Sequence, residues 1–196
     1  MLKLPLPPEN LRVWVGPFAD ADLFRESGEE TVRSIISLCG LKSNARVVDI
    51  GCGCGRVAAA LAAYLSDKGR YDGFDVAAPL INWCRVELEP RLPQFHFCLA
   101  DDVFAGGQNP AGHKDAAMFV FPYANDRFDL AILCSVLTHI LPDAIENYTR
   151  RWRRTTPMTN KPTMPETKAV GLSISPNFPV KAGRGASAAA TDAERR

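Results

Sequence analysis

The stretch Val47–Arg56, which reads VVDIGCGCGR, constrains the fold more than any other part of the chain. It joins a short apolar run to three glycines at alternate positions, Gly51, Gly53 and Gly55. The run predicts a buried strand, and the glycines predict a sharp turn in which a ligand can approach main-chain N–H groups. A plain tight turn is the alternative, but three alternate glycines are costly in backbone entropy, which favours ligand approach.

Strand and helix patterns alternate over the first three quarters of the chain. Strands are predicted at 46–50, 71–76, 95–99 and 127–134, and helices at 20–40, 56–66, 79–89 and 142–151. This alternation predicts an α/β fold with a doubly wound, mostly parallel sheet, right-handed crossovers and helices on both faces. In such a sheet the glycine turn lies at the carboxyl edge, where ligands bind.

Three parts follow from these patterns. Residues 1–40 form an N-terminal cap and helix, residues 41–151 form the core, and residues 152–196 form a tail. The tail is first proline-rich and then a basic low-complexity sequence, so we expect it to be disordered. From Arg150 onward, ten Lys or Arg face three acids, yet the whole chain carries a net charge of only +1. We interpret the arginines at 150–154 as a solvated surface and expect no nucleic-acid partner.

The six cysteines indicate free thiols. Cys39, Cys84, Cys98 and Cys134 lie in apolar runs, as small core residues do, which favours a reducing cytoplasm over disulfides. Cys52 and Cys54 lie beside the glycines without a second Cys or His pair nearby, so we expect no metal site. The chain shows neither a secretory h-region nor about 18 successive apolar residues, so we expect a cytoplasmic protein with no membrane association.

The ligand of the glycine turn is the next question. The dinucleotide fingerprint G-x-G-x-x-G fails because Arg56 stands where its third glycine would be. Asp49, two residues before the first glycine, would also repel a pyrophosphate and suits a cationic ligand or an amino group instead. A nicotinamide-dependent oxidoreductase is therefore disfavoured.

The pattern Asp49-x-Gly51-x-Gly53-x-Gly55 resembles the D/E-x-G-x-G-x-G motif of class I S-adenosylmethionine-dependent methyltransferases. The resemblance spans roughly residues 8–151 and implies a Rossmann-like fold whose core binds S-adenosylmethionine, with the loop around its methionine portion. The residues that it implies for cofactor binding are Asp49, Gly51, Cys52, Gly53, Gly55, Arg56, Asp75, Val76, Asp101, Asp102, Val103 and Ser135.

Three further segments carry the resemblance. Asp75 ends the second strand, where the family has an acid that binds both ribose hydroxyls, although an aspartate there also caps turns. Asp101 or Asp102 is similar to the family's acid near the adenine amino group, and the sequence does not choose between them. Phe128-Asp129 is similar to the family's "FD" before its fourth motif.

His139 follows the fourth strand, in the segment that the resemblance places at the methyl-transfer zone. It is a candidate catalytic base or orienter of the acceptor, because imidazole titrates near neutral pH, or else it packs beside the pocket. We interpret His96 as structural and assign no role to His113. Phe18 and Phe24 are expected to lie in an N-terminal segment that covers the cofactor.

The chain departs from the family after the fourth helix. Where the family has a run resembling R-V-L-K-P-G-G before a fifth strand, this chain reads RRWRRTTP at 150–157. The sheet is therefore predicted to stop at four strands, or five if Val170–Ile174 docks. We interpret the chain as truncated or divergent after about residue 151, with an incomplete C-terminal half and a fourth strand exposed to self-association.

Two functions follow from the sequence. The first is methyl transfer from S-adenosylmethionine to a small-molecule acceptor. The second is a catalytically inactive remnant that binds the cofactor or pairs with a partner.

Overall fold

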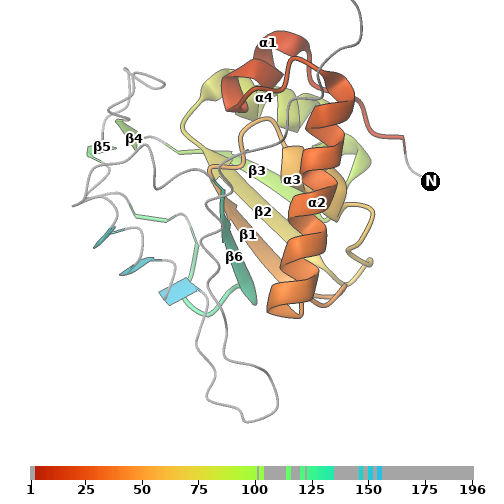
Figure 1. Cartoon of the computed structure of the whole chain (residues 1–196). Helices are drawn as coiled ribbons and strands as arrows, with labels where there is room; N and C mark the ends of the chain where they lie inside the picture. The colour runs from red at the N-terminus through yellow and green to blue at the C-terminus, as the bar shows by residue number, and fades with distance from the viewer. Residues whose placement is uncertain are drawn as a thin grey trace, which may run out of the picture.

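The structure is a computed structural model that describes residues 3–100, 102–103, 114–115, 120–121, 123–134, 146–147, 150–151 and 154–155. Its elements are α1 (Glu9–Arg12), the 3₁₀ turn η1 (Val13–Val15), α2 (Ala21–Cys39), β1 (Arg46–Ile50), α3 (Arg56–Leu61), β2 (Arg70–Asp75), α4 (Ala78–Glu87), the 3₁₀ turn η2 (Glu89–Arg91), β3 (Phe95–Leu99), β4 (Asp102–Val103), β5 (Lys114–Asp115) and β6 (Leu130–Leu133) (Figure 1).

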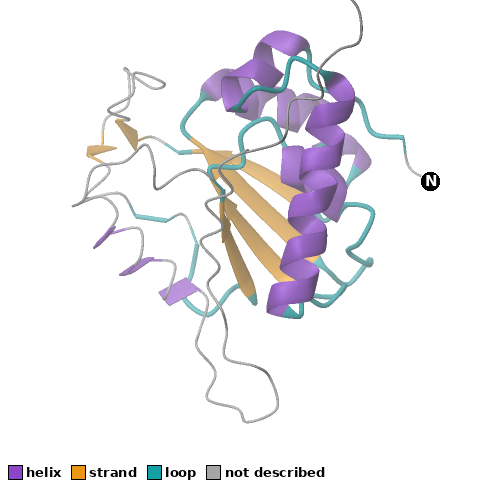
Figure 2. Ribbon diagram, viewed as in Figure 1, coloured by secondary structure: helices purple, strands orange, loops and turns teal. Residues whose placement is uncertain are grey.

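The central sheet has four parallel strands in the order β3-β2-β1-β6 (Figure 2). The chain runs outward from β1 to β3 on one side and then places β6 on the other side of β1. The strand order therefore reverses beside β1, which is the switch point where open α/β sheets bind ligands. The predicted Rossmann-like α/β fold and its four parallel strands are confirmed. A separate two-stranded parallel ladder joins β4 to β5.

Helix α2 matches its predicted bounds because local signals mark both of its ends. Asp20 is the N-cap, and its carboxylate accepts hydrogen bonds from the N–H groups of Asp22 and Leu23, both at 2.8 Å. Gly40 ends the helix in a left-handed conformation with φ of 65°. Helix α3 is shorter than predicted and ends at Leu61, and the strand expected at 127–134 is regular only from Leu130 to Leu133.

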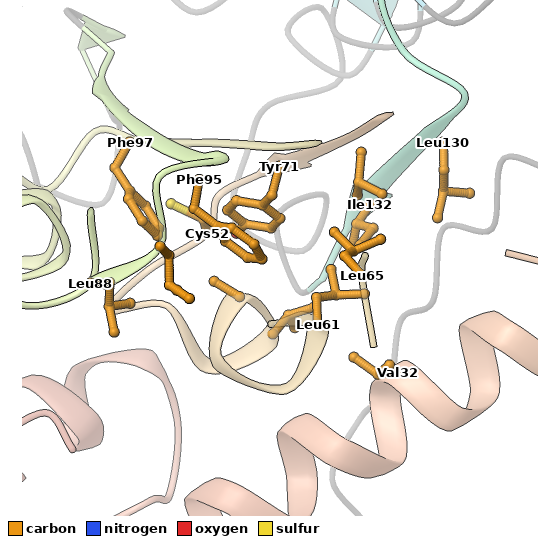
Figure 3. Close-up of a cluster of buried hydrophobic side chains, with 14 of the residues drawn as sticks. Val32, Cys52, Leu61, Leu65, Tyr71, Leu88, Phe95, Phe97, Leu130 and Ile132 are labelled. Atoms are coloured by element: carbon orange, nitrogen blue, oxygen red, sulfur yellow. The ribbon is translucent and has the colours of Figure 1, made fainter. Parts of the chain in front are cut away.

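The three longest helices pack on one face of the sheet. Residues of α2, α3 and α4 share one hydrophobic cluster with β1, β2, β3 and β6, which includes Val32, Leu61, Tyr71, Phe95 and Ile132 (Figure 3). The opposite face carries a second cluster, formed by alternate residues of the same strands with Phe121 and Phe128. The period of two residues along each strand thus supplies both faces.

The helix predicted at 142–151 is described only in part. Residues 146–147 and 150–151 are helical, as are 154–155 just beyond. The backbone N–H groups of Asp126 and Phe128 donate to the carbonyls of Arg154 and Thr155, at 2.9 and 3.0 Å. This segment therefore returns to the start of β6. The candidate strand Val170–Ile174 and most of the predicted tail lie outside the described residues.

Candidate functional site

The glycine turn folds back over the end of β2. Gly51, Gly53 and Gly55 have φ angles of 75°, 56° and 80°, all in the left-handed region that disfavours side chains. The N–H groups of Gly51 and Cys52 donate to the Phe74 carbonyl, at 2.8 and 3.1 Å. The turn is thereby fixed at the carboxyl edge of the sheet, where the sequence predicts a ligand.

Two of these glycines are also required by close packing. A Cβ on Gly53 would lie 2.7 Å from Cγ1 of Val15, and a Cβ on Gly55 would lie 2.7 Å from Cδ1 of Leu88. Gly53 therefore lies directly against the N-terminal segment, and Gly55 lies against the end of α4. The third glycine also starts α3 as its N-cap.

Asp75, the last residue of β2, binds the glycine turn itself. Its Oδ2 accepts a hydrogen bond from the Gly53 N–H and its Oδ1 accepts one from the Ala77 N–H, both at 2.9 Å. Burial raises the pKa of this carboxyl, and the backbone donors partly offset the rise. Asp75 therefore caps this turn, which agrees with the alternative interpretation from the sequence. Each carboxylate oxygen has a second lone pair, so the predicted ribose contact is compatible with it and stays a prediction.

Asp49 is almost completely buried on β1, with 1% of its surface exposed. The Tyr71 hydroxyl donates to its Oδ2 at 2.7 Å, while Oδ1 is buried and has no hydrogen-bond partner among the described residues. Burial raises the pKa of Asp49 to about 6, although the Tyr71 hydrogen bond and the charge of Arg56 both act to lower it. This carboxylate is therefore incompletely satisfied at the predicted ligand site.

Arg56 ties the glycine turn to the N-terminal part of the chain. Its Nη1 donates to the hydroxyls of Ser27 at 2.8 Å and Thr31 at 3.2 Å on α2. Its guanidinium also lies over the Phe18 ring, 5.3 Å from the centroid. These contacts hold α2 against α3, and the predicted contact of Arg56 with a cofactor stays a prediction.

A buried arginine that the sequence analysis missed organises the N-terminal segment. The Arg12 guanidinium donates to the carbonyls of Pro7 at 2.7 Å and Phe18 at 3.0 Å, and also to that of Ala19. Phe18 meets Phe24 edge to face, with ring centroids 5.8 Å apart. The apolar residues that flank Arg12 in the sequence were a signal for its burial.

Phe18 and Phe24 lie in a third hydrophobic cluster, whose members include Cys54 of the turn and Leu80 of α4. The segment expected to cover the cofactor therefore packs against the glycine turn and α4. This places it at the carboxyl edge, next to the predicted ligand site.

All six cysteines lie within the described residues, and none of them forms a disulfide. The Sγ atoms of Cys84 and Cys52 lie 3.6 and 3.8 Å from the Gly53 carbonyl oxygen, and that of Cys54 lies 3.7 Å from the Leu11 carbonyl oxygen. Burial raises the pKa of all three thiols, so they stay protonated and neutral. In the described part of the chain, no cluster of three or more His, Cys, Asp or Glu is arranged to hold a metal ion.

The other predicted site residues are placed less fully. Val76 follows β2 and packs, half-buried, against the cluster that contains Phe74. Asp102 and Val103 form β4. Asp101, Ser135 and His139 lie outside the described residues, as does His113, and their predicted roles stay predictions. His96 lies on β3 with its side chain exposed.

The start of β6 gives the Phe-Asp pair a structural role. Phe128 is buried, with 1% of its surface exposed, and packs in the second hydrophobic cluster. The carboxylate of Asp129 accepts hydrogen bonds from the side chain of Arg46 and from the backbone N–H of Arg46. Arg46 begins β1 and Asp129 immediately precedes β6, so this contact lies at the amino ends of the two strands, away from the glycine turn.

Comparison with known families identifies the family of this chain. Residues 48–157, more than half of the chain, match the family model described as "Methyltransferase domain". The chain belongs to this methyltransferase domain family. The match includes the glycine turn, Asp75 and the Phe128-Asp129 pair. The resemblance to class I S-adenosylmethionine-dependent methyltransferases is thereby confirmed.

Solved methyltransferases share this fold at low sequence identity. A crystal structure of a SAM-dependent methyltransferase from Aquifex aeolicus is 16% identical with a TM-score of 0.51, and the match covers 78% of this chain and 68% of that one. A putative S-adenosyl-L-methionine-dependent methyltransferase from Methanococcus maripaludis is 15% identical with a TM-score of 0.53, covering 68% and 52%. Coclaurine N-methyltransferase, solved with N-methylheliamine and SAH, is 15% identical with a TM-score of 0.54, covering 78% and 41%.

The present chain thus spans 68%, 52% and 41% of these three proteins. The helices in the described ranges are all too short or too polar to traverse a lipid bilayer.

Proposed function

We propose that this methyltransferase-family chain binds S-adenosylmethionine at the carboxyl edge of its sheet and transfers the methyl group to a small-molecule nucleophile. The observation that carries the proposal is the left-handed glycine turn, held between the buried Asp49 and the carboxylate of Asp75. The family match supports methyl transfer in general. The acceptor class and the individual site residues are our inference.

The residues at this edge fit the cofactor. Asp49 has a buried oxygen without a hydrogen-bond partner among the described residues, which suits the ammonium of a methionine group, reached directly or through an ordered water. Asp75 keeps free lone pairs beside Gly53, which suit a vicinal diol. The glycines carry no side chains, so a ligand can approach the backbone of the turn closely. When bound, S-adenosylmethionine supplies an electrophilic methyl carbon on a positively charged sulfur.

The chain's own contribution is binding, orientation and exclusion of water. Holding an acceptor in line with a donor converts the reaction to an effectively unimolecular one, with effective molarities of about 10⁵–10⁸ M. The N-terminal segment, which reaches Gly53 through Val15, is positioned to cover the site. For a hydroxyl acceptor, His139 is the candidate base, and such a base contributes about 10²–10⁴-fold.

The alternative is an inactive chain that pairs with a partner through β6. β6 stands at the end of the order of the described strands, which favours this alternative. The backbone bonds from Asp126 and Phe128 to the 154–155 segment cover the start of this edge within the chain itself. A monodisperse monomer in sedimentation velocity would argue against pairing through β6. The proposal includes a cytoplasmic location, which six cysteines in no disulfide support.

The experiment that tests the proposal is calorimetric titration of S-adenosylmethionine and S-adenosylhomocysteine into the full chain. We expect saturable binding by the wild-type chain. Asp75→Ala should weaken binding by about 10- to 100-fold, because hydrogen bonds to a charged group are lost. Asp129→Asn is the matched control, since it neutralises an aspartate near the opposite end of the sheet and should leave the affinity unchanged.

Because Asp75 also binds the Gly53 N–H, circular dichroism and thermal unfolding must accompany the titration. A folded Asp75→Ala variant with reduced affinity supports the ribose role. A folded, monodisperse wild-type chain that binds neither ligand would overturn the enzyme function.

A further inference from the structure

Tyr71 links the aromatic core of the protein to the candidate cofactor site. Its ring is fully buried and stacks on Phe95, with centroids 4.9 Å apart, while Phe97 lies at 5.6 Å (Figure 3). Its hydroxyl donates to Oδ2 of Asp49 at 2.7 Å. The packing around the ring therefore fixes the position of the hydroxyl, and the hydroxyl in turn orients the carboxylate.

The glycine opposite Asp49 leaves room for this arrangement. Asp49 of β1 is in register with Gly73 of β2, two residues beyond Tyr71. A Cβ on Gly73 would lie 3.0 Å from Cε1 of Tyr71 and also 3.0 Å from Sγ of Cys52, which is tighter than ordinary contact. The absence of a side chain at Gly73 thus accommodates both the tyrosine ring and the glycine turn.

Opposing charges surround the carboxylate. Arg56 of α3 favours the ionised form of Asp49, whereas Asp75 of β2 disfavours it. The neighbouring thiols of Cys52, Cys84 and Cys134 all have pKa values raised by burial and contribute no charge near neutral pH.

The remaining neighbour of the carboxylate is the phenol of Tyr71. Burial raises its pKa well above the ordinary value, so it remains a hydrogen-bond donor throughout the physiological range. Its hydrogen bond lowers the pKa of Asp49 and opposes the effect of burial.

We propose that Tyr71 is a positioning residue for cofactor binding, which holds Asp49 by one oxygen so that the other, Oδ1, accepts a hydrogen bond from the ammonium of the cofactor or from an ordered water bound to it. The inference rests on the proposed function and adds to it a residue that itself lies in the core. If Tyr71 served only to fill the core, Phe would replace it with no effect on ligand binding beyond a uniform change in stability.

The test is the affinity of the full chain for S-adenosylhomocysteine as a function of pH between 5 and 7.5, measured by calorimetry. Wild-type affinity should fall as the pH drops through about 6, where Asp49 becomes protonated. In Tyr71→Phe this fall should begin at a pH roughly 1 to 2 units higher, because a hydrogen bond to a charged acceptor has been removed. At pH 7.5 the affinity should drop by about 1.3- to 4-fold, because a smaller fraction of Asp49 is ionised.

Two matched variants separate positioning from packing. Phe95→Leu disturbs the ring that stacks on Tyr71 but keeps the hydroxyl, so it should lower the melting temperature and leave the pH midpoint of binding unchanged. Asp49→Asn should remove the fall in affinity near pH 6. The double variant Asp49→Asn/Tyr71→Phe should likewise show no fall in affinity near pH 6, because the group that titrates there has been removed.

The outcomes distinguish this inference from the proposed function. A folded Tyr71→Phe chain that binds with the wild-type pH midpoint overturns the role of Tyr71 and leaves the function intact. A wild-type chain that binds at no pH overturns both.

Should Tyr71→Phe fail to fold, wild-type protein grown with 3-fluorotyrosine replaces it. The more acidic phenol is a stronger donor and should move the midpoint to lower pH, whereas an unchanged midpoint would overturn the inference.

Discussion

Aspartates at the two ends of the same parallel sheet have pKa values that are shifted in opposite directions. At the amino end, Arg46 and Asp129 form a two-pronged ion pair, with Nη2 to Oδ1 at 2.8 Å and Nε to Oδ2 at 3.2 Å. The Arg46 N–H also donates to Oδ2 of Asp129, and the Asp129 N–H donates to the Arg46 carbonyl, both at 2.8 Å. Burial acts to raise the pKa of Asp129, but the hydrogen bonds from Arg46 outweigh it, and the pKa is lowered.

At the carboxyl end, by contrast, burial prevails. The pKa values of Asp49 and Asp75 are both raised, and Asp49 keeps an oxygen without a partner among the described residues. The Arg46–Asp129 ion pair, called the clamp below, stabilises the fold. The buried carboxylates of Asp49 and Asp75 at the carboxyl end destabilise the fold when they are ionised. Groups held at such a cost are typical of sites that bind ligands or catalyse reactions.

The largest expected effect tests the glycine turn. Gly55→Ala should lower the free energy of unfolding by about 2–4 kcal/mol, because the left-handed conformation and overpacking against Leu88 both penalise a side chain. Gly40→Ala is the control at the end of α2, since Gly40 is also left-handed but has nothing within 4 Å of the added Cβ. It should cost only about 1–2 kcal/mol. Urea unfolding of both variants measures the difference, and equal losses would contradict the packing argument.

The second prediction concerns the buried charge of Asp49, whose removal should raise the free energy of unfolding rather than lower it. The pKa of Asp49 is about 6 in the fold against 3.8 for an ordinary carboxyl, so its stabilising contribution is complete below 3.8 and is lost as the pH rises through 6. The Asp49→Asn variant should therefore be more stable than wild type at pH 8, by up to about 3 kcal/mol. The cost of an unpaired amide N–H in the variant reduces this gain. The difference should diminish towards pH 4. Urea unfolding at both pH values checks this, and a pH-independent difference would contradict it.

The smallest effect concerns the clamp at the amino end. Asp129→Asn should cost no more than about 1 kcal/mol at pH 7, because both partners are nearly half exposed and solvent screens their attraction. The lowered pKa of Asp129 means that its contribution is present above the ordinary carboxyl pKa and is lost as the pH falls through the folded value. Wild type and variant should converge at low pH. A larger loss at pH 3 than at pH 7 would contradict this account of the clamp.

Local signals in the sequence were sufficient for much of the fold. Asp20 and Gly40 marked the two ends of α2, and the β-branched run at 46–50 marked β1. The spacing of Asp49 from the three glycines predicted the sharp glycine turn, in which all three glycines are left-handed. Each of these features is carried by residues that are close in sequence, so each can be recognised in one dimension.

What only the tertiary structure decided are the contacts between distant segments. Gly28 lets α2 approach α3 so closely that an added Cβ would lie 2.5 Å from the Arg56 carbonyl oxygen. Arg56 extends to Ser27 and Thr31 across that same contact, which its place in the sequence beside the glycines did not indicate. A half-buried guanidinium bonds to the acceptors that the packing brings near it, and the neighbouring residues in the sequence do not specify those acceptors.

The sequence by itself thus determined that this chain forms a parallel α/β sheet with a glycine turn between two acids. The tertiary structure decided how those acids are held, because pairing in register across β1 and β2 sets the Tyr71 hydroxyl against Asp49, twenty-two positions away. Burial then sets the pKa of that carboxyl, and burial is a property of the packed molecule as a whole.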